Sequence, residues 1–495
     1  MERRKFIQAS SVTALGLMGM NSGFTMAPAT MDFLKVHGRK IVNESGREVR
    51  LRGFSFASWL NFENFIIGMP GHESGIRKSV AQILGEDKAR FFFNSFLNHF
   101  VAEDDFKFMQ SMGCNLVRIP FNYRHFESDD KPFEYMQEGF TWLDKAIAWA
   151  HKYGVYLILD MHAAQGCQSP PFFADNISGM AFLWDQKMYQ DRAIALWQEI
   201  ARHYRNETAI AGYDILNEPE AEHISQLNRF YHEAVKAIRK VDKKHILFIE
   251  GDGYSTRYNE IDHPFDSNAV YCTHFYSPCG MEVMEYPGVW SNNGQYYDRE
   301  KLRQEYIERT TFMRQHNVPN WFGETSVTFT DMVSEDSRMR FLEDMLGIAE
   351  EMGDSWTFGI YKDLGKTGIV YANPDSEWVR RIKPVRKAIT ELHCNPFAEN
   401  FKSDQIGTLC RDMGKYVKEV IGKLDEQLTV NEMAGTIRFF LCECVLPRQL
   451  QIPFAKQFSG MNEEEIDRMM QSFALKNCCQ RSGWVGVVKK ITGAL

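Results

Sequence analysis

Val155-Tyr156-Leu157-Ile158-Leu159-Asp160 is the stretch of sequence that decides the fold of this chain. It is an apolar run of strand length that follows Gly154 and ends on an acidic residue. Such an uninterrupted run is typical of a strand buried on both faces, as in a parallel sheet. An amphipathic helical stretch, residues 143–150, comes shortly before it.

The same alternation of helix and strand recurs along the chain. The other apolar runs cover residues 49–56, 115–121, 212–217, 245–250, 269–276, 320–324 and 356–361. Residues 194–204 and 228–241 are further amphipathic helical stretches between these runs. Eight β/α units in about 350 residues predict an α/β fold, a (β/α)₈ or TIM barrel.

Two regions before the second run do not repeat this unit. The turn signal Asn43-Glu44-Ser45-Gly46 precedes the first barrel strand, and we expect an N-terminal β-hairpin before the barrel. Residues 60–105 form a long first βα loop, which we expect beside the mouth of the barrel as part of a cleft wall.

The C-terminal residues 396–495 have a different pattern. Apolar residues at helical spacing are Ile406, Leu409, Met413, Tyr416, Val417, Val420 and Leu424. Asn462 before three glutamates predicts a helix start. We therefore predict a barrel domain over residues 30–395 and a helical C-terminal extension over residues 396–495, with the apolar stripe as core or docking surface.

Residues 1–29 predict an export signal. Arg3-Arg4-Lys5-Phe6-Ile7 is followed by a moderately apolar stretch and by Ala27-Pro28-Ala29, where cleavage is expected. The paired arginines resemble a bacterial twin-arginine signal, although Glu2 stands where that pattern has Ser or Thr. We expect the mature protein to be periplasmic or extracellular.

Composition narrows the class of partner. The net charge is −8 and the sequence pI is about 6.0, so the chain lacks an electrostatic attraction to nucleic acid or anionic lipid. No apolar run long enough to span a membrane follows the N-terminus, and we expect no stable membrane insertion after signal cleavage. The oligomeric state stays open.

The ten cysteines predict neither a disulfide scaffold nor a zinc site, because no CxxC pair occurs. We interpret them as buried thiols that act as small apolar side chains. A disulfide or metal role stays as the alternative for Cys442, Cys444, Cys478 and Cys479. We expect no cofactor and no bound metal.

Polar residues end most of the apolar runs, and in a barrel of this kind they converge on one mouth. They are Arg118, Asp160 with His162, Asn217 with Glu218, His274 with Tyr276, Glu324, and Tyr361 with Lys362 and Asp363. Glu218 and Glu324 are the pair that matters most. Hydrolysis of a glycosidic bond needs two carboxyl groups, one to protonate the leaving oxygen and one to attack the sugar or activate water. A separation of about 5 Å gives retention and one of about 6.5–9.5 Å gives inversion.

Six motifs in this order resemble glycoside hydrolase family 5, over roughly residues 34–395. They are Leu51-Arg52-Gly53, Arg118-Ile119-Pro120-Phe121, Asp160-Met161-His162, Leu216-Asn217-Glu218-Pro219, His274-Phe275-Tyr276 and Gly323-Glu324. The family includes cellulases, mannanases, exo-β-glucanases and enzymes that act on glycolipids. Each motif lies at a predicted strand end, which a chance match does not require.

The resemblance implies a retaining mechanism and a role for each residue. Glu218 would be the general acid/base and Glu324 the nucleophile. Asn217 would hold the sugar 2-hydroxyl. Arg118 and Tyr276 would orient Glu324 and keep it ionised, and His162 and His274 would line the subsite of the reacting sugar.

The eighth run departs from the family pattern, in which many members end this strand with a Trp under the sugar. Trp356 lies near the strand start, so we expect Tyr361 to replace that Trp, or Lys362 and Asp363 to make polar sugar contacts. The long first loop with Trp59, Trp184 and Trp290 could close the cleft into a pocket. A pocket would favour exo-action or a glycoside with a small or lipid aglycone.

These observations predict a retaining β-glycosidase that acts on a β-glucan, a β-linked oligosaccharide or a related glycoside. A glycolipid or steryl-glycoside hydrolase of the same family is one alternative. A metal-dependent barrel hydrolase, with Asp160, His162, His274 and Asp363 as ligands, is a second. A non-catalytic sugar-binding barrel is a third.

Overall fold

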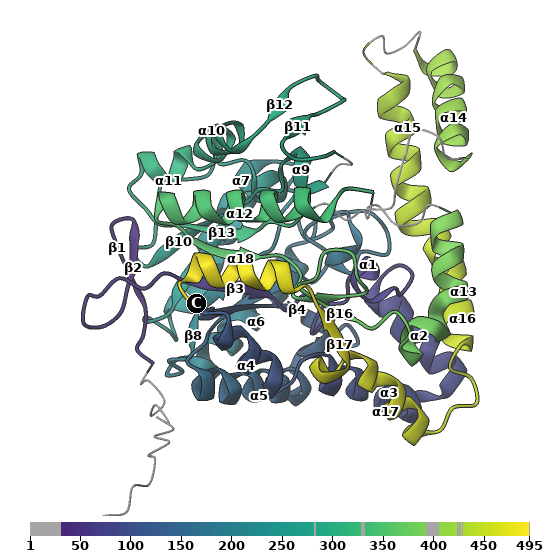
Figure 1. Ribbon diagram of the computed structural model, residues 1–495, viewed down its shortest axis with the longest axis horizontal. Coiled ribbons are helices and arrows are strands. Elements are labelled where there is room, and N and C mark those ends of the chain that lie inside the picture. The colour runs from purple at the N-terminus through teal and green to yellow at the C-terminus, as the bar shows by residue number, and fades with distance from the viewer. Residues whose placement is uncertain are drawn as a thin grey trace, which may run out of the picture.

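The structure is a computed structural model of the chain (Figure 1). It describes residues 31–281, 284–327, 332–392, 405–422, 427 and 429–494. The predicted export signal over residues 1–29, the domain boundary after residue 395 and Cys394 lie outside the described residues and stay predictions.

Eight parallel strands close into a barrel at the centre of the molecule (Figure 1). In chain order they are β3 (Arg52–Ser55), β4 (Leu116–Asn122), β7 (Tyr156–Ala163), β8 (Ile210–Asp214), β9 (Ile246–Glu250), β10 (Ala269–His274), β13 (Asn320–Glu324) and β14 (Ser355–Phe358). Each strand pairs in parallel with the next, and β14 pairs with β3. The predicted TIM barrel is confirmed.

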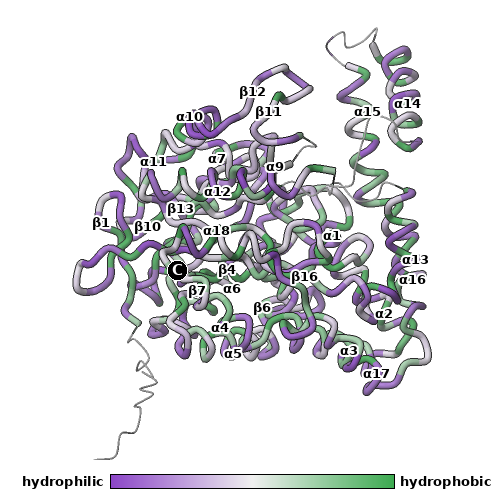
Figure 2. Tube along the Cα trace, viewed as in Figure 1, coloured by the Kyte–Doolittle hydropathy of each residue, from purple (hydrophilic) through white to green (hydrophobic). Residues whose placement is uncertain are grey.

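Helices surround the strands, and most of them are amphipathic. They are α4 (Glu103–Ser111), α5 (Gln137–Tyr153), α6 (Lys187–Tyr204), α7 (Ile224–Arg239), α10 (Arg299–Arg309), α11 (Thr311–Gln315), α12 (Glu335–Met352) and α13 (Glu377–Glu391). In α7, buried residues recur every three or four positions from Leu227 to Ile238, so one face of the helix packs inward. Figure 2 shows that α10, by contrast, is mainly hydrophilic. None of the helices in the described ranges is both long and apolar enough to cross a membrane.

The connecting segments carry short elements. They are η1 (Tyr123–His125), β5 (Glu127–Ser128), β6 (Lys131–Tyr135), η2 (Phe172–Ala174), α8 (Asp252–Ser255), α9 (Ser277–Met281), β11 (Gly288–Val289), β12 (Tyr296–Tyr297), β15 (Lys362–Asp363) and β16 (Val370–Ala372). Segments that follow the carboxyl ends of the strands supply the walls of the site described below.

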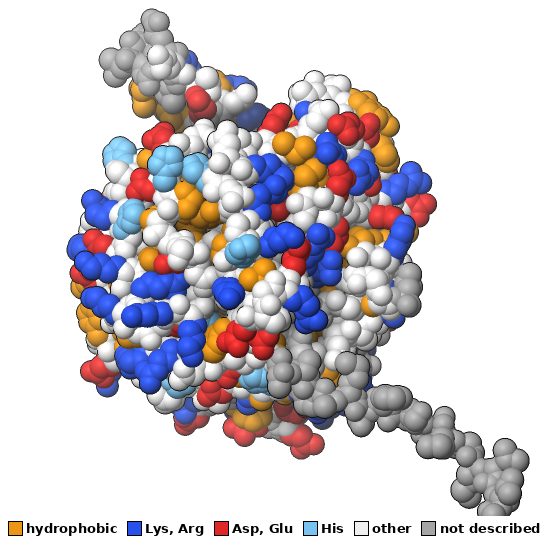
Figure 3. Space-filling model, turned by 90° about the vertical axis from the view of Figure 1, so that its left-hand side faces the viewer, with side chains coloured by type: hydrophobic (Ala, Val, Ile, Leu, Met, Phe, Trp, Pro, Cys, Tyr) orange, Lys and Arg blue, Asp and Glu red, His pale blue; other side chains and the backbone are white. Residues whose placement is uncertain are grey.

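The expected N-terminal hairpin is present and closes one end of the barrel. β1 (Lys35–His37) and β2 (Lys40–Val42) pair antiparallel. Leu34 and Ile41 are buried against residues at strand starts, such as Leu116. Figure 3 faces this side of the molecule, where positive and negative side chains are interspersed. The opposite end of the barrel, where the strands finish, carries the candidate active site described below.

The long first βα loop folds into helices, α1 (Asn64–Ile67), α2 (Glu73–Leu84) and α3 (Glu86–Phe100). Phe92 and Phe96 on α3 are fully buried. They pack against Phe458 and Phe473 of the C-terminal extension, with ring centroids 4.8 and 5.2 Å apart respectively. The loop therefore forms part of the core as well as part of the cleft wall.

The C-terminal extension wraps around the barrel. Its elements are α14 (Gln405–Ile421), α15 (Val430–Phe439), the π-helix η3 (Phe440–Val445), α16 (Leu446–Lys456), α17 (Glu463–Met470), η4 (Gln471–Phe473), η5 (Leu475–Asn477), β17 (Cys478–Gln480) and α18 (Ser482–Thr492). The predicted helix start is confirmed, because Asn462 caps α17. The extension is not purely helical, since β17 pairs antiparallel with β16 beside the barrel.

The apolar stripe of α14 is not a core face. Leu409, Met413, Tyr416 and Val420 are all more than half exposed, while Cys410 and Gly414 face inward. The helix packs on α15, and the pair projects from the rest of the molecule (Figure 1). Of the two interpretations offered by the sequence, core is wrong for these residues and a docking surface stays a prediction.

Candidate active site

Arg118 lies in the centre of the barrel and organises the carboxylates around it. Its side chain is fully buried. It forms ion pairs with Asp160 at 3.0 Å, Asp214 at 3.2 Å and Glu250 at 3.3 Å, and with Glu324. It also donates to Asn217 Oδ1 at 2.6 Å. Although burial lowers the pKa of Arg118, these carboxylates raise it well above its usual value.

Glu324, at the end of β13, is held ionised. Arg118 Nη1 donates to its Oε1, and the hydroxyl of Tyr276 donates to its Oε2 at 2.5 Å. Burial raises the pKa of Glu324, but the positive charges of His274 and Arg118 outweigh it and hold that pKa well below its ordinary value. The structure therefore brings Arg118 and Tyr276 to this carboxylate, as the sequence predicted, and adds His274, which the sequence had assigned to the sugar subsite.

Glu218 follows β8 in a left-handed backbone conformation, with φ of 45°. A non-glycine residue adopts this conformation at an energetic cost that its surroundings must offset. Here its N–H donates to Glu250 Oε2 at 2.7 Å, and the hydroxyl of Ser169 donates to its carbonyl oxygen. These bonds aim the Glu218 side chain into the mouth, where His274 Nδ1 lies 2.7 Å from Oε1.

The protonation of Glu218 differs from that of Glu324. Burial raises the pKa of Glu218, and the negative charge of Glu324 raises it further, against the hydrogen bond from His274. The pKa values of the two carboxyl groups are therefore shifted in opposite directions, as expected for a proton donor, Glu218, beside an anion, Glu324.

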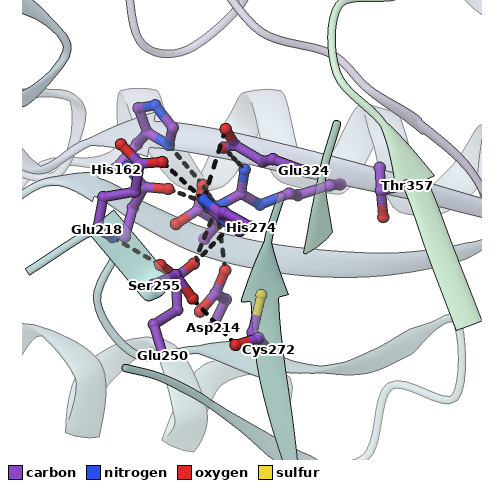
Figure 4. Close-up of polar contacts among 12 residues, drawn as sticks. His162, Asp214, Glu218, Glu250, Ser255, Cys272, His274, Glu324 and Thr357 are labelled. Carbon is purple, nitrogen blue, oxygen red and sulfur yellow. Dashed lines mark hydrogen bonds and ion pairs between the residues drawn. The ribbon is translucent and has the colours of Figure 1, made fainter. Parts of the chain in front are cut away.

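The two carboxyl groups lie close together (Figure 4). One side-chain oxygen of Glu218, one of Glu324 and a ring nitrogen of His274 all lie within 4.8 Å of one another. His274 Nδ1 is 3.6 Å from Glu324 Oε2, so the imidazole contacts both carboxylates. Glu250 and Glu324 raise the pKa of His274 well above its usual value, despite burial.

His162 lies on the other side of the pair and lines the cavity. Its Nδ1 is 2.7 Å from Asp160 Oδ2, and its Nε2 is 3.8 Å from Glu63 Oε1. Burial lowers the pKa of His162, but Asp160 and Glu63 raise it above its usual value. Of the residues predicted from Arg118 to Glu324, five line the cavity, and Arg118, Asp160 and Asn217 are buried behind them; the lining residues are His162, Glu218, His274, Tyr276 and Glu324.

Sequence reasoning missed Glu63 and Glu250. Burial, together with Glu324 and Glu218, raises the pKa of Glu63 to about 7. Glu63 comes from the first βα loop, and no motif marks it. Glu250 ends β9, so the rule that selected the other strand-end residues would have selected it too.

The mouth opens into a cavity of about 950 Å³. Aromatic side chains form much of its wall: Phe65, Phe172, Phe173, Tyr254, Phe275, Tyr276, Trp290, Tyr297 and Phe439. Six glutamates line the cavity: Glu63, Glu305, Glu308 and Glu443 in addition to Glu218 and Glu324. Arg309 also lines it. Of the tryptophans expected to close the cleft, Trp290 lines it, whereas Trp59 and Trp184 are buried elsewhere.

Tyr361, Lys362 and Asp363 do not line the cavity, which corrects the prediction that they contact the sugar. Tyr361 donates to Asp105 Oδ1 at 2.8 Å, and Lys362 Nζ donates to Phe473 O at 2.9 Å. The Asp363 carboxylate accepts backbone N–H groups of the following turn. The physical reason is that β14 ends at Phe358, earlier than its apolar run, so that Gly359 and Ile360 face the mouth instead.

The ligand set of the metal alternative is not assembled, because Asp363 lies in that turn. Among the described residues, the groups close enough to share an ion are Glu218–His274–Glu324 and Glu250–Cys272–His274. Glu324 and Glu250 are already paired with Arg118. Burial raises the pKa of the Cys272 thiol, which disfavours the thiolate that a metal requires. These residues therefore fit a carboxylate pair better than a metal centre.

Comparison with known proteins agrees with this geometry. The family model described as cellulase, glycosyl hydrolase family 5, matches residues 79–361. A β-xylosidase of Phanerodontia chrysosporium is 33% identical over 467 residues, which cover 92% of this chain and 97% of that protein. Endoglucanase C of Acetivibrio thermocellus is 27% identical over 300 residues, 52% of this chain and 84% of that protein.

A solved structure of Thermotoga maritima Cel5A, in complex with mannotriose, covers 54% of this chain and 85% of its own, with 21% identity and a TM-score of 0.44. The family assignment rests on the family model and on the β-xylosidase, whose alignment extends through the C-terminal extension. The chain belongs to the cellulase family, glycosyl hydrolase family 5, and is an O-glycosyl hydrolase.

Proposed function

We propose that this protein is a retaining, exo-acting β-glycosidase that hydrolyses short β-linked oligosaccharides through a glycosyl–Glu324 intermediate. The observation that carries the proposal is the separation of the two carboxyl groups. Oxygens of Glu218 and Glu324 lie within 4.8 Å of each other. Retaining enzymes have a spacing of about 5 Å, whereas inverting enzymes need about 6.5–9.5 Å to admit a water molecule.

In the first step, ionised Glu324 attacks the anomeric carbon while the glycosidic C–O bond breaks. Glu218 gives its proton to the departing oxygen, which leaves as a hydroxyl group. In the second step, Glu218 takes a proton from water, and that water displaces Glu324 from the sugar. The pKa shifts support this division, since burial raises the pKa of Glu218, whereas His274 and Arg118 hold the pKa of Glu324 well below its ordinary value.

Asn217 is placed to assist the first step. Its Oδ1 is occupied by Arg118, and its Nδ2 has no hydrogen-bond partner among the described residues. This unpartnered donor, on the residue next to the acid/base in the chain, is the group that we assign to the sugar 2-hydroxyl. A hydrogen bond that strengthens towards the oxocarbenium-like transition state lowers the barrier rather than only KM.

The shape of the site and the more similar of the two relatives both favour a short substrate. The cavity is bounded by the first βα loop and by the C-terminal extension, which contribute Phe65 and Phe439. The relative that shares both regions is named a β-xylosidase, while the endoglucanase aligns with only 52% of the chain. A pocket closed in this way suits attack at a chain end, with a xylosyl or glucosyl unit as the first candidates.

The test is hydrolysis of a panel of aryl β-glycosides, xylo- and cello-oligosaccharides, β-glucans and lipid glycosides, with product configuration followed by NMR. We expect retained configuration and a loss of at least about 10³-fold in kcat for Glu324→Gln. Azide should restore turnover in Glu218→Ala and give a β-glycosyl azide, and it should give an α-glycosyl azide with Glu324→Ala. An inverted product, or internal cleavage of β-glucan as the main activity, would refute the proposal.

A further inference from the structure

The C-terminal extension reaches into the active-site cavity. Phe439 ends α15 and Glu443 lies in η3, and both line the same cavity as Glu218 and Glu324. A π-helix between two α-helices is uncommon and occurs frequently at functional sites. Both residues lie beyond the segment matched by the family model, which ends at residue 361.

Contacts of η3, and of α16 that follows it directly, with the barrel loops hold this segment in position. Arg448 Nη2 donates to Ile177 O at 2.6 Å, and Gln451 Nε2 donates to Pro70 O at 3.4 Å. Gly179, with φ of +72°, lies so close that a Cβ there would be 2.7 Å from the Phe440 ring. The wall that η3 contributes is therefore built against the loop that follows β7 and the first βα loop.

Glu443 has unsatisfied hydrogen-bonding capacity. Its side chain is only 5% exposed, and its Oε2 has no hydrogen-bond partner among the residues that the structure describes. Burial raises the pKa of Glu443 to about 8, against a hydrogen bond from the Phe172 backbone. A carboxylic acid that stays protonated at neutral pH both donates and accepts, which matches the dual character of a sugar hydroxyl.

Tyr254 indicates on which side of the reacting bond Glu443 lies. Burial raises the pKa of Tyr254, and the negative charges of Glu220, Glu218 and Glu443 raise it further. Tyr254, Glu218 and Glu443 line the same cavity, and the loop after β7 contacts both glutamates: the Ser169 hydroxyl donates to the carbonyl oxygen of Glu218, and the Phe172 backbone donates to Glu443. Because Glu218 protonates the leaving oxygen, this side of the cavity receives the leaving group.

We propose that Glu443, with Phe439 and Phe172, forms the subsite for the leaving sugar, in which the carboxyl group binds a hydroxyl of that sugar and the rings pack on its apolar face. This specificity subsite rests on the proposed function. It selects a leaving group that is itself a sugar over one that carries no hydroxyl. Leaving a buried polar atom without a partner is unfavourable, and a leaving-sugar hydroxyl supplies that partner.

The test compares a disaccharide with a 4-nitrophenyl glycoside of the same reacting sugar, xylose or glucose, in the full-length protein. For Glu443→Leu we expect kcat/KM to fall about 10- to 100-fold on the disaccharide and less than about 3-fold on the nitrophenyl glycoside. Glu443→Gln keeps a donor and an acceptor and should retain most of the activity on both. Glu419→Leu, on the exposed surface of α14, is the matched control and should change neither.

Two further readouts separate this proposal from its alternatives. The melting temperature of each variant should stay within about 3 °C of wild type. A larger fall with equal losses on both substrates would mean a structural role and overturn the proposal, as would unchanged disaccharide activity in Glu443→Leu. Calorimetric binding of the disaccharide, in the Glu324→Gln background and in wild type, tests the subsite even if no glycoside is turned over. Binding that is absent, or equally tight in Glu443→Leu, would overturn the subsite alone.

Discussion

At the scale of single residues, Arg118 supplies the positive charge that four carboxyl groups share. It is the guanidinium that faces Asp160, Asp214, Glu250 and Glu324, and all five side chains are buried or nearly so. Breaking a buried ion pair from one side leaves an uncompensated charge, which costs far more than the pair contributes. Stability and catalysis therefore depend on the same residue.

Replacing Arg118 by Met should lower the free energy of unfolding by about 3–5 kcal/mol and abolish turnover, because Glu324 loses the charge that keeps it ionised. Urea unfolding and kcat/KM on the best substrate measure both effects. Arg202→Met removes a half-exposed pair with Glu199 and should cost less than about 1 kcal/mol. Equal stability of the two variants would contradict the argument.

The pH dependence of kcat/KM should be bell-shaped, with limbs that belong to different glutamates. Activity falls as pH drops through the lowered pKa of Glu324, which must be ionised, and as pH rises through the raised pKa of Glu218, which must be protonated. Tyr276→Phe removes a hydrogen bond that lowers the pKa of Glu324. The acidic limb should therefore move to higher pH while the basic limb stays in place. Movement of the basic limb instead would assign the residues the other way round.

At the scale of elements, the segment after β14 joins the barrel to its additions. Lys362 in β15 donates to the carbonyl oxygen of Phe100 at 2.5 Å, at the end of α3, and to that of Phe473 in η4. It also pairs with Asp105 at 2.9 Å, with both side chains fully buried. This one side chain links the first βα loop, the barrel and the extension.

Lys362→Met should accordingly destabilise the fold by about 3–5 kcal/mol, because Asp105 is left buried without its partner. KM should stay near the wild-type value, since Lys362 does not line the cavity. Chemical unfolding and steady-state kinetics provide the two measurements. Tyr361→Phe, which removes one hydrogen bond to Asp105, is the milder companion and should cost about 1 kcal/mol. A raised KM at unchanged stability would restore the sugar-binding role that the sequence predicted.

At the scale of the whole molecule, the chain has a net charge of −8, and the cavity carries carboxyl groups on its wall as well as in the catalytic pair. Glu305 and Glu308 from α10 line the cavity, and Arg309 contributes a guanidinium to the same wall. A field of one sign disfavours a substrate of the same sign, and salt weakens that effect. The site is thus suited to neutral sugars.

A 4-nitrophenyl β-glucuronide should be hydrolysed at least about 10-fold less efficiently than the β-glucoside at low ionic strength. The difference should narrow as salt is added, and Glu308→Gln should narrow it further. Measurements of kcat/KM for both glycosides at two salt concentrations test whether charge causes this preference. A preference that is insensitive to salt would mean that shape, rather than charge, rejects the uronide.

The sequence by itself determined the barrel and most of its catalytic mouth. Runs such as residues 155–160, which alternate with amphipathic helical stretches, are typical of strands buried on both faces of a parallel sheet. The barrel then brings strand-end residues together whatever their spacing in the chain. The strand-end rule therefore found Glu218 and Glu324 without knowledge of any distance, whereas Arg118 lies inside β4 and not at its end. It would also have found Glu250.

Tertiary structure alone decided where β14 ends, how far apart the two glutamates lie and what closes the cavity. An apolar run shows burial but not the residue at which the backbone turns, so the last three strand-end candidates, Tyr361 among them, were misplaced. Glu63 lies in the long first βα loop and Glu443 in the C-terminal extension, and the sequence marked no site residue in either segment. Their place beside the catalytic pair depends on docking between segments hundreds of residues apart, which no local pattern encodes.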